Sequence, residues 1–134
     1  MTRVAVVGAT GYAGAELVRI LAGHPKVELS LLTSRQYAGK KFSDVFPAMA
    51  GVLNDFCEDY SAGVASERAD IVFTALPHKL PMEIVPELVK AGKRVVDLSA
   101  DFRFSDYSLY ESHYQPHTCR ELLDKSVYGL SEVY

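Results

Sequence analysis

The sequence predicts an α/β fold with a doubly wound parallel sheet that carries helices on both faces. Short runs rich in β-branched residues alternate along the chain with segments in which apolar residues recur at helical spacing. The run at residues 69–75 is almost continuously apolar, as expected for a strand that is buried on both faces of a parallel sheet. A glycine-rich turn joins the first strand-like run to the first helical one. The 134 residues suit a single domain of this kind.

The expected elements follow one another in a regular order. We expect strands at residues 3–7, 27–33, 69–75 and 94–98. We expect helices at residues 12–21 and 82–90. Gly23 and Pro25 end the first helix, because glycine accepts the capping conformation and proline cannot continue a helix. The stretch between the second and third strands is less regular. Residues 99–134 are aromatic-rich and are expected to be mostly loop, with short helical pieces near residues 107–114 and 119–125.

The turn after the first strand is typical of a Rossmann-type, dinucleotide-binding loop. Gly8 can take the tight turn out of the strand, and Gly14 lets the helix pack closely against it. Gly11 has no Cβ, so a pyrophosphate can approach the backbone there and meet the free N–H groups of the helix start. The spacing is G-x-x-G-x-x-G rather than G-x-G-x-x-G, so another kind of α/β turn is the alternative. The residues that we assign to cofactor binding in this turn are Gly8, Thr10, Gly11, Tyr12, Ala13 and Gly14.

The end of the second strand favours NADP(H) over NAD(H). Domains that bind NAD usually place an acidic residue here to hold the ribose 2′-hydroxyl, and this sequence has Ser34 and Arg35 instead. Ser34 can donate a hydrogen bond, and the Arg35 guanidinium can form charge-assisted bonds to a 2′-phosphate. The alternative is that Arg35 is a solvated surface cation.

The third strand is followed by Ala75, Leu76, Pro77 and His78. Ligands of doubly wound sheets bind beyond the carboxyl ends of the strands, so this turn faces the same region as the glycine loop. Small residues and a proline-fixed turn leave room for a flat nicotinamide ring, and we assign Leu76, Pro77 and His78 to cofactor binding. His78 can titrate or form a hydrogen bond there, or it is a polar residue at the entry to the next helix.

Charged and hydroxyl side chains follow the fourth strand. Asp97, Ser99, Asp101 and Arg103 lie within seven positions of each other. The planar guanidinium of Arg103 suits a phosphate or carboxylate. The alternative is a structural ion-pair network in which Asp97 and Asp101 pair with Arg103.

Composition excludes several classes of function. The net charge of −3 gives no electrostatic basis for binding nucleic acid or an anionic membrane. No apolar run reaches transmembrane length, and residues 2–3 lead directly into a strand without the apolar region of a signal peptide. A cytoplasmic location follows by elimination.

The cysteines and histidines do not form a convincing reactive centre. Cys57 and Cys119 lie far apart, and neither follows a predicted strand or begins either of the two longer predicted helices, so we expect reduced thiols that are buried or incidental. His113 and His117 have i, i+4 spacing, but Pro116 interrupts the helix that would place both rings on one face. We therefore expect no metal site.

Five segments together resemble N-acetyl-γ-glutamyl-phosphate reductase, a family of arginine biosynthesis related to aspartate-semialdehyde dehydrogenase. They occur in the family's order along the whole chain: GATGYAG at residues 8–14, TSR at 33–35, ALPH at 75–78, DLSADFR at 97–103 and YGLSE at 128–132. The resemblance implies NADPH-dependent reduction of an acyl phosphate to a semialdehyde with release of phosphate. It also implies that the glycine loop, Ser34 and Arg35 hold the cofactor, and that Arg103 with Ser99 holds the substrate phosphate.

The sequence departs from the family near its end. In the family a cysteine nucleophile lies in an Asn-Pro-Gly-Cys segment a little beyond Tyr-Gly-Leu-Pro-Glu, whereas this sequence has Ser131 at the proline and ends at Tyr134. We therefore assign no catalytic residue within the chain. The nucleophile, the acid/base histidine and the substrate domain are expected beyond Tyr134. The chain is expected to be the NAD(P)-binding part of an enzyme that is a homo-oligomer, and to be inactive alone.

Two other functions remain open. One is a non-catalytic NADP-binding module, and the other is a related acyl-phosphate reductase of the aminoadipate or aspartate semialdehyde type. The excess of aromatic rings between Phe102 and Tyr134 predicts an uncovered apolar surface that contacts a substrate domain or another subunit.

Overall fold

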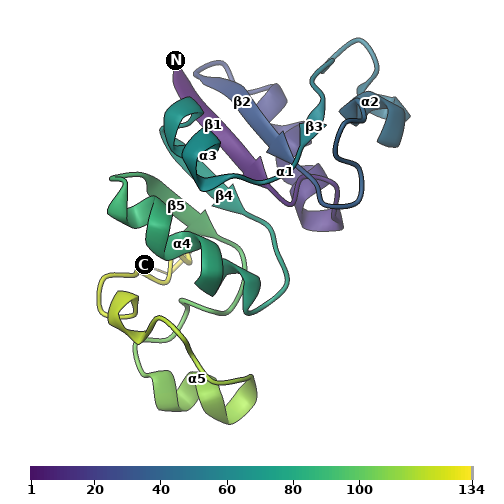
Figure 1. Ribbon diagram of the computed structural model, residues 1–134. Coiled ribbons are helices and arrows are strands. Elements are labelled where there is room, and N and C mark those ends of the chain that lie inside the picture. The colour runs from purple at the N-terminus through teal and green to yellow at the C-terminus, as the bar shows by residue number, and fades with distance from the viewer. Residues whose placement is uncertain (134) are drawn as a thin grey trace.

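A five-stranded, fully parallel sheet forms the centre of the structure, a computed structural model that describes residues 1–133 (Figure 1). The order of the strands across the sheet is β3-β2-β1-β4-β5, which places the first strand in the middle. The strands are β1 (Thr2–Val7), β2 (Val27–Thr33), β3 (Cys57–Glu58), β4 (Ile71–Thr74) and β5 (Arg94–Asp97). The chain moves outward from β1 to β3 on one side and then crosses back to β4, so the order reverses between β1 and β4.

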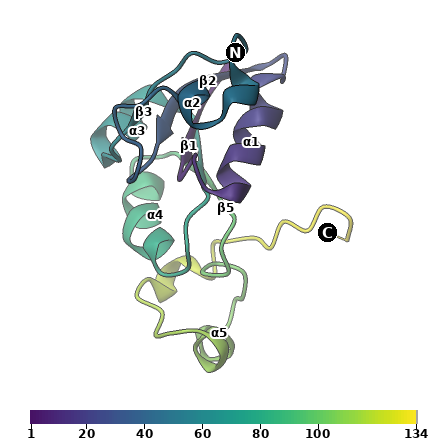
Figure 2. The ribbon, with the colours of Figure 1, turned by 90° about the vertical axis from the view of Figure 1, so that its right-hand side faces the viewer.

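Helices cover both faces of this sheet, which confirms the predicted fold class. Helix α1 (Tyr12–Ala22) lies on one face, and α3 (Ala62–Arg68) and α4 (Leu80–Lys90) lie on the other (Figure 2). Two further short helical segments, α2 (Phe42–Val45) and the 3₁₀ turn η1 (Pro47–Met49), lie between β2 and β3.

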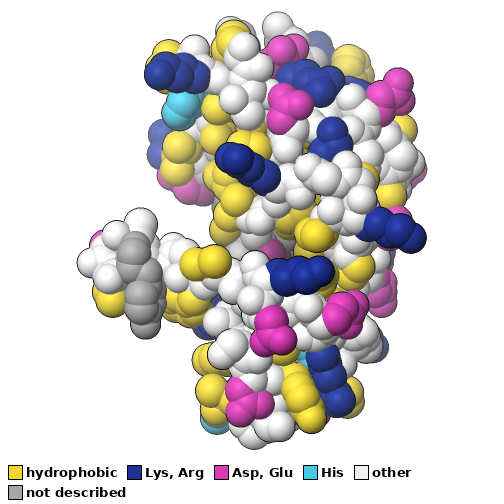
Figure 3. All heavy atoms as spheres, turned by 90° about the vertical axis from the view of Figure 1, so that its left-hand side faces the viewer, with side chains coloured by type: hydrophobic (Ala, Val, Ile, Leu, Met, Phe, Trp, Pro, Cys, Tyr) yellow, Lys and Arg dark blue, Asp and Glu magenta, His cyan; other side chains and the backbone are white. Residues whose placement is uncertain are grey.

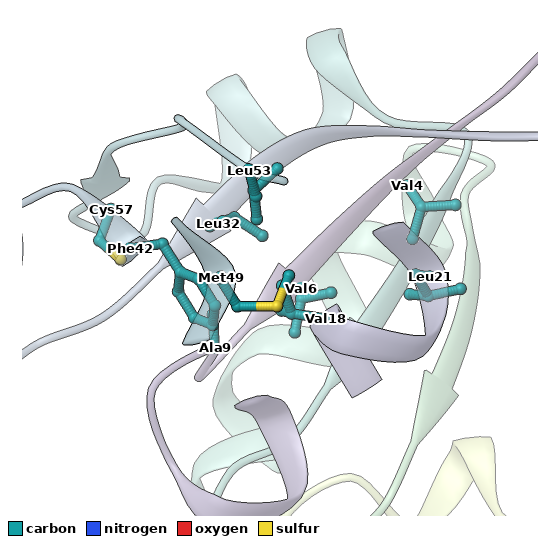
Figure 4. Close-up of a cluster of buried hydrophobic side chains, with 10 residues drawn as sticks. All are labelled: Val4, Val6, Ala9, Val18, Leu21, Leu32, Phe42, Met49, Leu53 and Cys57. Carbon is teal, nitrogen blue, oxygen red and sulfur yellow. The ribbon is translucent and has the colours of Figure 1, made fainter. Parts of the chain in front are cut away.

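Alternate residues of β1 pack into separate apolar clusters on the two faces. Val4 and Val6 contact the cluster that contains Val18 of α1 (Figure 4). Ala5 belongs to the opposite cluster, which contains Leu88 of α4. A strand that is covered on both faces needs apolar residues at successive positions, which explains the unbroken run in the sequence.

The elements predicted from periodicity are present with small shifts at their ends, whereas β3 and α3 were not predicted. β3 has only two residues, and its hydrogen-bonded partners are Leu32 and Thr33 of β2, far away in sequence. Helix α3 has seven residues, and its start is stabilised by Ser61, whose hydroxyl accepts a hydrogen bond from the amide of Val64. Such short segments carry too few residues for a recognisable period, and their contacts with the sheet determine their structure.

The segment after β5 forms a small lobe of its own. It contains α5 (Tyr107–His113) and the 3₁₀ turn η2 (Arg120–Leu122), in agreement with the two expected helical pieces. Tyr110 and Cys119 are buried there against Met82 of α4. Residues 127–133 then extend away from the body, with apolar side chains on their surface (Figures 2 and 3). Tyr134 lies outside the described residues.

Within the described part of the chain, no helix is long and apolar enough to cross a lipid bilayer.

Replacing Tyr60 with phenylalanine is expected to stabilise the fold. The Tyr60 hydroxyl is buried without a hydrogen-bond partner among the described residues, and burial raises its pKa to about 12. Removing an unsatisfied buried hydroxyl should increase the free energy of unfolding by about 1 kcal/mol, measured by urea denaturation.

Tyr110→Phe is the matched control. The Tyr110 hydroxyl donates to Asp101 at 2.7 Å and accepts from Gln115 at 2.6 Å, so its removal should lower the free energy of unfolding by about 1–3 kcal/mol. A destabilised Tyr60→Phe variant would show that the Tyr60 hydroxyl has a stabilising partner, such as a bound water.

Candidate functional site

The turn between β1 and α1 requires glycine at two positions. Gly8 has a φ of +86°, and a Cβ at this position would overlap the carbonyl oxygen of Ala75 after β4. A Cβ at Gly14 would overlap the carbonyl group of Gly8. The structure thus confirms both predicted reasons for glycine, a tight turn at Gly8 and close packing of the helix at Gly14.

Gly11 is different, because no part of the protein requires glycine there. Its φ of −73° is accessible to any residue, and a Cβ would come no closer than 3.9 Å to another part of the chain, the Gly8 carbonyl oxygen. Gly11 is the N-cap of α1, no described side chain caps this end of the helix, and the first turn contains no acidic residue. The start of α1 therefore offers backbone N–H groups and the positive end of the helix dipole to an anion, with open space at Gly11.

Hydrogen bonds hold the glycine loop against the end of β2. The amides of Gly8 and Ala9 donate to the carbonyl oxygen of Thr33, at 3.2 and 2.9 Å. One residue further along, the hydroxyl groups of Thr10 and Ser34 are 2.7 Å apart and share a hydrogen bond. The loop is therefore positioned by the second strand as well as by the first.

Ser34 and Arg35 play different parts at this strand end. Ser34 is only 3% exposed, and its hydroxyl also accepts a hydrogen bond from the amide of Tyr37 at 3.0 Å. These bonds fix the position of the Ser34 oxygen, and the hydroxyl proton can reach a cofactor only when Thr10 is the donor of the shared bond. Arg35 is exposed and makes no ion pair with any carboxylate in the described residues.

The turn after β4 lies against the glycine loop. The Leu76 side chain lies beside Gly8, and Pro77 and His78 follow Leu76 at the surface. The His78 Nδ1 atom accepts a hydrogen bond from the amide of Ala100 at 3.2 Å, so the neutral ring carries its proton on Nε2. His78 is therefore attached to the turn after β5 and is more than a polar residue at a helix entry.

A chain of hydrogen bonds fixes the turn after β5. The Thr74 hydroxyl donates to Asp97 at 2.8 Å, and the Ser99 hydroxyl donates to the same carboxylate at 2.6 Å. The Ser99 oxygen also accepts from the amide of Asp101 at 3.1 Å, and its single proton is donated to Asp97, so a phosphate oxygen can accept from this hydroxyl only in place of Asp97. Burial raises the pKa of Asp97, against the opposing effect of the hydroxyl donors.

Asp101 is the buried centre of the same region. Its side chain is fully buried and accepts hydrogen bonds from the Tyr110 hydroxyl at 2.7 Å and from the backbone amide of Lys79 at 2.8 Å. Lys79 has a φ of +82°, the one positive value outside glycine in the described chain. No spacing in the sequence predicts the bond between the Lys79 amide and Asp101, because the two residues follow different strands.

Arg103 has neither of the two aspartates as a partner. Both carboxylates are engaged with other donors, and the Arg103 guanidinium instead lies over the Tyr128 ring, 5.6 Å from its centroid. The alternative ion-pair network of the sequence analysis is therefore wrong. Arg103 and Ser99 both line a cavity of about 680 Å³ that is bounded by β5, α4 and the segment before Tyr134.

The two thiols are buried, as predicted. Burial raises the pKa of Cys57, and burial, with nearby carboxylates, raises the pKa of Cys119 to about 12. His117 is also buried, and its ring bonds to the Asp101 carbonyl oxygen and to the Cys119 amide. No group of three or more potential metal ligands occurs in the described residues.

Comparison with known proteins shows to which family the chain belongs. Residues 3–134 match the family described as "Semialdehyde dehydrogenase, NAD binding domain". The chain belongs to this family. The candidate site is thus the carboxyl edge of the sheet in a semialdehyde dehydrogenase NAD-binding domain, where the glycine loop and the turns after β4 and β5 meet.

Relatives of the domain are longer proteins. The chain is 54% identical over 133 residues to an N-acetyl-γ-glutamyl-phosphate reductase of Geobacter sulfurreducens and 49% identical over 134 residues to one of Desulfotalea psychrophila. These alignments cover 99% and 100% of this chain but only 38% and 39% of the relatives. A solved aspartate semialdehyde dehydrogenase with NADP from Candida albicans superposes with a TM-score of 0.67 at 26% identity, over 77% of this chain and 31% of that one.

Gly14 and Gly11 should respond differently to replacement by alanine. Gly14→Ala should lower the free energy of unfolding by about 1–3 kcal/mol, because the new methyl group overlaps the Gly8 carbonyl. Gly11→Ala should change it by less than about 1 kcal/mol, the cost of a poorer N-cap residue. Urea denaturation of both variants checks the difference, and equal losses would contradict the close helix–loop packing.

Asp97→Asn is expected to stabilise the domain more at neutral than at acid pH. The pKa of Asp97 is raised by burial, so its protonated form favours folding, and this contribution is lost as the pH rises through the folded-state pKa. Asparagine has a similar volume and stays neutral at every pH, so the variant does not lose this stability as the pH rises. The difference in free energy of unfolding between variant and parent should therefore grow between about pH 4 and pH 7.

The exposed Asp59 supplies the control for that titration. Asp59→Asn should give a small difference from the parent across the same pH range. A constant Asp97→Asn difference would show that Asp97 is ionised at equal cost in the folded and unfolded states.

Proposed function

We propose that this chain binds NADPH for the reduction of N-acetyl-γ-glutamyl phosphate to N-acetylglutamate semialdehyde with release of phosphate. The relatives from Geobacter sulfurreducens and Desulfotalea psychrophila are named for this substrate, and the family is an NAD-binding domain. We also propose that residues 1–134 form one domain whose task is to hold the cofactor. The cofactor, when bound, supplies a hydride.

The uncapped start of α1 is the observation that carries the proposal. Gly11 leaves open space beside the first turn, and this end of the helix has neither a capping side chain nor an acidic residue among the described residues. Backbone N–H groups and the helix dipole there suit the pyrophosphate of a dinucleotide. Thr10, Tyr12 and Ala13 complete this loop, and the side chain of Tyr12 is fully exposed beside it.

Arg35 supports a preference for NADPH over NADH. Its guanidinium lies just beyond β2, is exposed and has no carboxylate partner in the described chain. A 2′-phosphate would give it two parallel charge-assisted bonds. Ser34 acts beneath it by fixing the loop through Thr10 and the Tyr37 amide.

The turns after β4 and β5 support the positions of the nicotinamide and the substrate. Leu76 lies beside Gly8, and Pro77 follows it at the surface. The Nε2 proton of His78 can orient an acceptor because Nδ1 is bonded to the Ala100 amide. Arg103 on the cavity wall is the group that would hold the substrate phosphate, with Ser99 beside it.

The described thiols do not supply the nucleophile of such a reaction. Both are buried, and burial raises the pKa of each, so the reactive thiolate is disfavoured. We therefore propose that the nucleophile and the acid/base histidine belong to a part of the enzyme outside these residues, and that this chain alone reduces no acyl phosphate.

The exposed apolar residues of the last lobe support association with another domain or subunit. Tyr107, Leu109 and Tyr114 of the α5 region are each more than a third exposed, and so are Val127 and Leu130 near the end of the chain. Such a surface fits the proposed homo-oligomer or a substrate domain. Free cysteines agree with our proposal of a cytoplasmic location.

Calorimetric titration with NADPH and NADH tests the cofactor assignment. The chain should bind NADPH more tightly, Gly11→Val should lose both cofactors because a side chain fills the pyrophosphate space, and Arg35→Asp should lose about ten- to hundredfold in NADPH affinity. Circular dichroism confirms that each variant remains folded.

Equal affinity of the parent for both cofactors would contradict the role of Arg35, and unchanged binding by Gly11→Val would place the cofactor elsewhere. An absorbance assay at 340 nm with NADPH and N-acetyl-γ-glutamyl phosphate tests the chemistry. The chain alone should show no oxidation of NADPH, and turnover would contradict our placement of the nucleophile outside the described residues.

A further inference from the structure

The loop between β2 and α2 concentrates positive charge in an acidic protein. Residues 34–41 contain Arg35, Lys40 and Lys41 and no aspartate or glutamate, although the whole chain has a net charge of −3. In the described structure none of the three cations forms an ion pair. Three unneutralised cations on one loop repel each other, which suggests that an anion compensates them.

Backbone hydrogen bonds hold both ends of this loop against β3. The Ser34 amide donates to the Glu58 carbonyl at 3.0 Å, and the Gly39 amide donates to the neighbouring Cys57 carbonyl at 2.7 Å. The Cys57 amide in turn donates to the Lys40 carbonyl at 2.8 Å. The loop therefore folds over the carboxyl end of β3, and Lys40 has a fixed backbone position.

Lys40 and Lys41 face different neighbours. The Lys40 Nζ atom lies 6.0 Å from the centroid of the Tyr37 ring, and the Tyr37 amide is bonded to the Ser34 hydroxyl. The Lys41 Nζ atom lies 5.8 Å from the Phe56 ring, on the residue that precedes β3. The backbones of both lysines run beside residues 56–57, but the Lys40 side chain approaches Tyr37, which is bonded to Ser34, whereas the Lys41 side chain approaches Phe56.

We infer that Lys40 is a second specificity-determining cation that binds the 2′-phosphate of NADPH together with Arg35, with Tyr37 as the ring surface beside the adenosine. The inference rests on the proposed function, because it deepens the cofactor preference of the same site. One guanidinium can form two directed bonds to a phosphate dianion, and a mobile ammonium on the same loop neutralises its remaining charge. The Lys40–Tyr37 contact places the ammonium beside the ring on which a base can lie.

The experiment uses ligands that report on this subsite alone. Adenosine 2′,5′-bisphosphate carries the 2′-phosphate and 5′-AMP lacks it, and neither has a nicotinamide. Lys40→Gln should weaken adenosine 2′,5′-bisphosphate and NADPH about tenfold and leave 5′-AMP and NADH within about twofold. Lys40→Arg should restore most of the affinity, because it restores the charge.

Lys41→Gln is the matched control, since it removes the same charge one residue away. It should change binding of either adenosine ligand by less than about twofold at 0.15 M salt, where the screening length is about 8 Å. Equal losses for Lys40→Gln and Lys41→Gln would overturn the inference in favour of a general effect of net charge.

The binding measurements distinguish an error about Lys40 from an error about the cofactor. A parent chain that prefers NADPH, with an unaffected Lys40→Gln variant, overturns the role of Lys40 and leaves the cofactor assignment standing. A parent chain without preference for the 2′-phosphate overturns the NADPH assignment and the role of Lys40 together.

Discussion

The contact between Gly14 and the carbonyl group of Gly8 controls the geometry on which the rest of the site depends. It lets the first turn of α1 lie directly on the loop that leaves β1, so the N-terminus of the helix opens at the carboxyl edge of the sheet. Because β4 pairs with β1 in parallel, with Thr74 opposite Val7, β4 ends at the same edge. A wider helix–strand spacing would move the backbone N–H groups away from the turns that flank them.

A second set of hydrogen bonds connects the turns that follow β4 and β5. Thr74 and Ser99 bind the Asp97 carboxylate, and the buried Asp101 holds the backbone of Lys79 in a conformation that favours glycine. Carboxylates that are partly buried, like Asp97, or fully buried, like Asp101, require several donors to compensate for lost hydration. Their donors here are hydroxyl and amide groups, so Arg103 remains available at the cavity wall.

Some cations of the domain form ion pairs that connect its elements, and others do not. Arg3 pairs with Asp70 at 3.0 Å, and Arg68 makes two bonds to Glu58 and one to the carbonyl of Ser30, so both connect elements of the sheet. Arg35 and Arg103 have no such carboxylate among the described residues and lie beyond the ends of β2 and β5. The domain thus carries positive charge without a carboxylate partner at the two positions where we propose that phosphates bind, although its net charge is negative.

The sequence by itself determined the layered α/β class, most of the long elements and the glycine loop. Each depends on local chemistry that is visible in the sequence. Strand-like runs and helical spacing follow one another along the chain, Gly8 allows the positive φ of the turn, and an arginine replaces an acidic residue after β2. Only the tertiary structure decided the two-residue β3, the burial of Ser34 and the bonds that occupy Asp97 and Asp101. These features arise from contacts between distant segments, as with the Lys79 amide and Asp101, and no local spacing encodes which strand ends will meet.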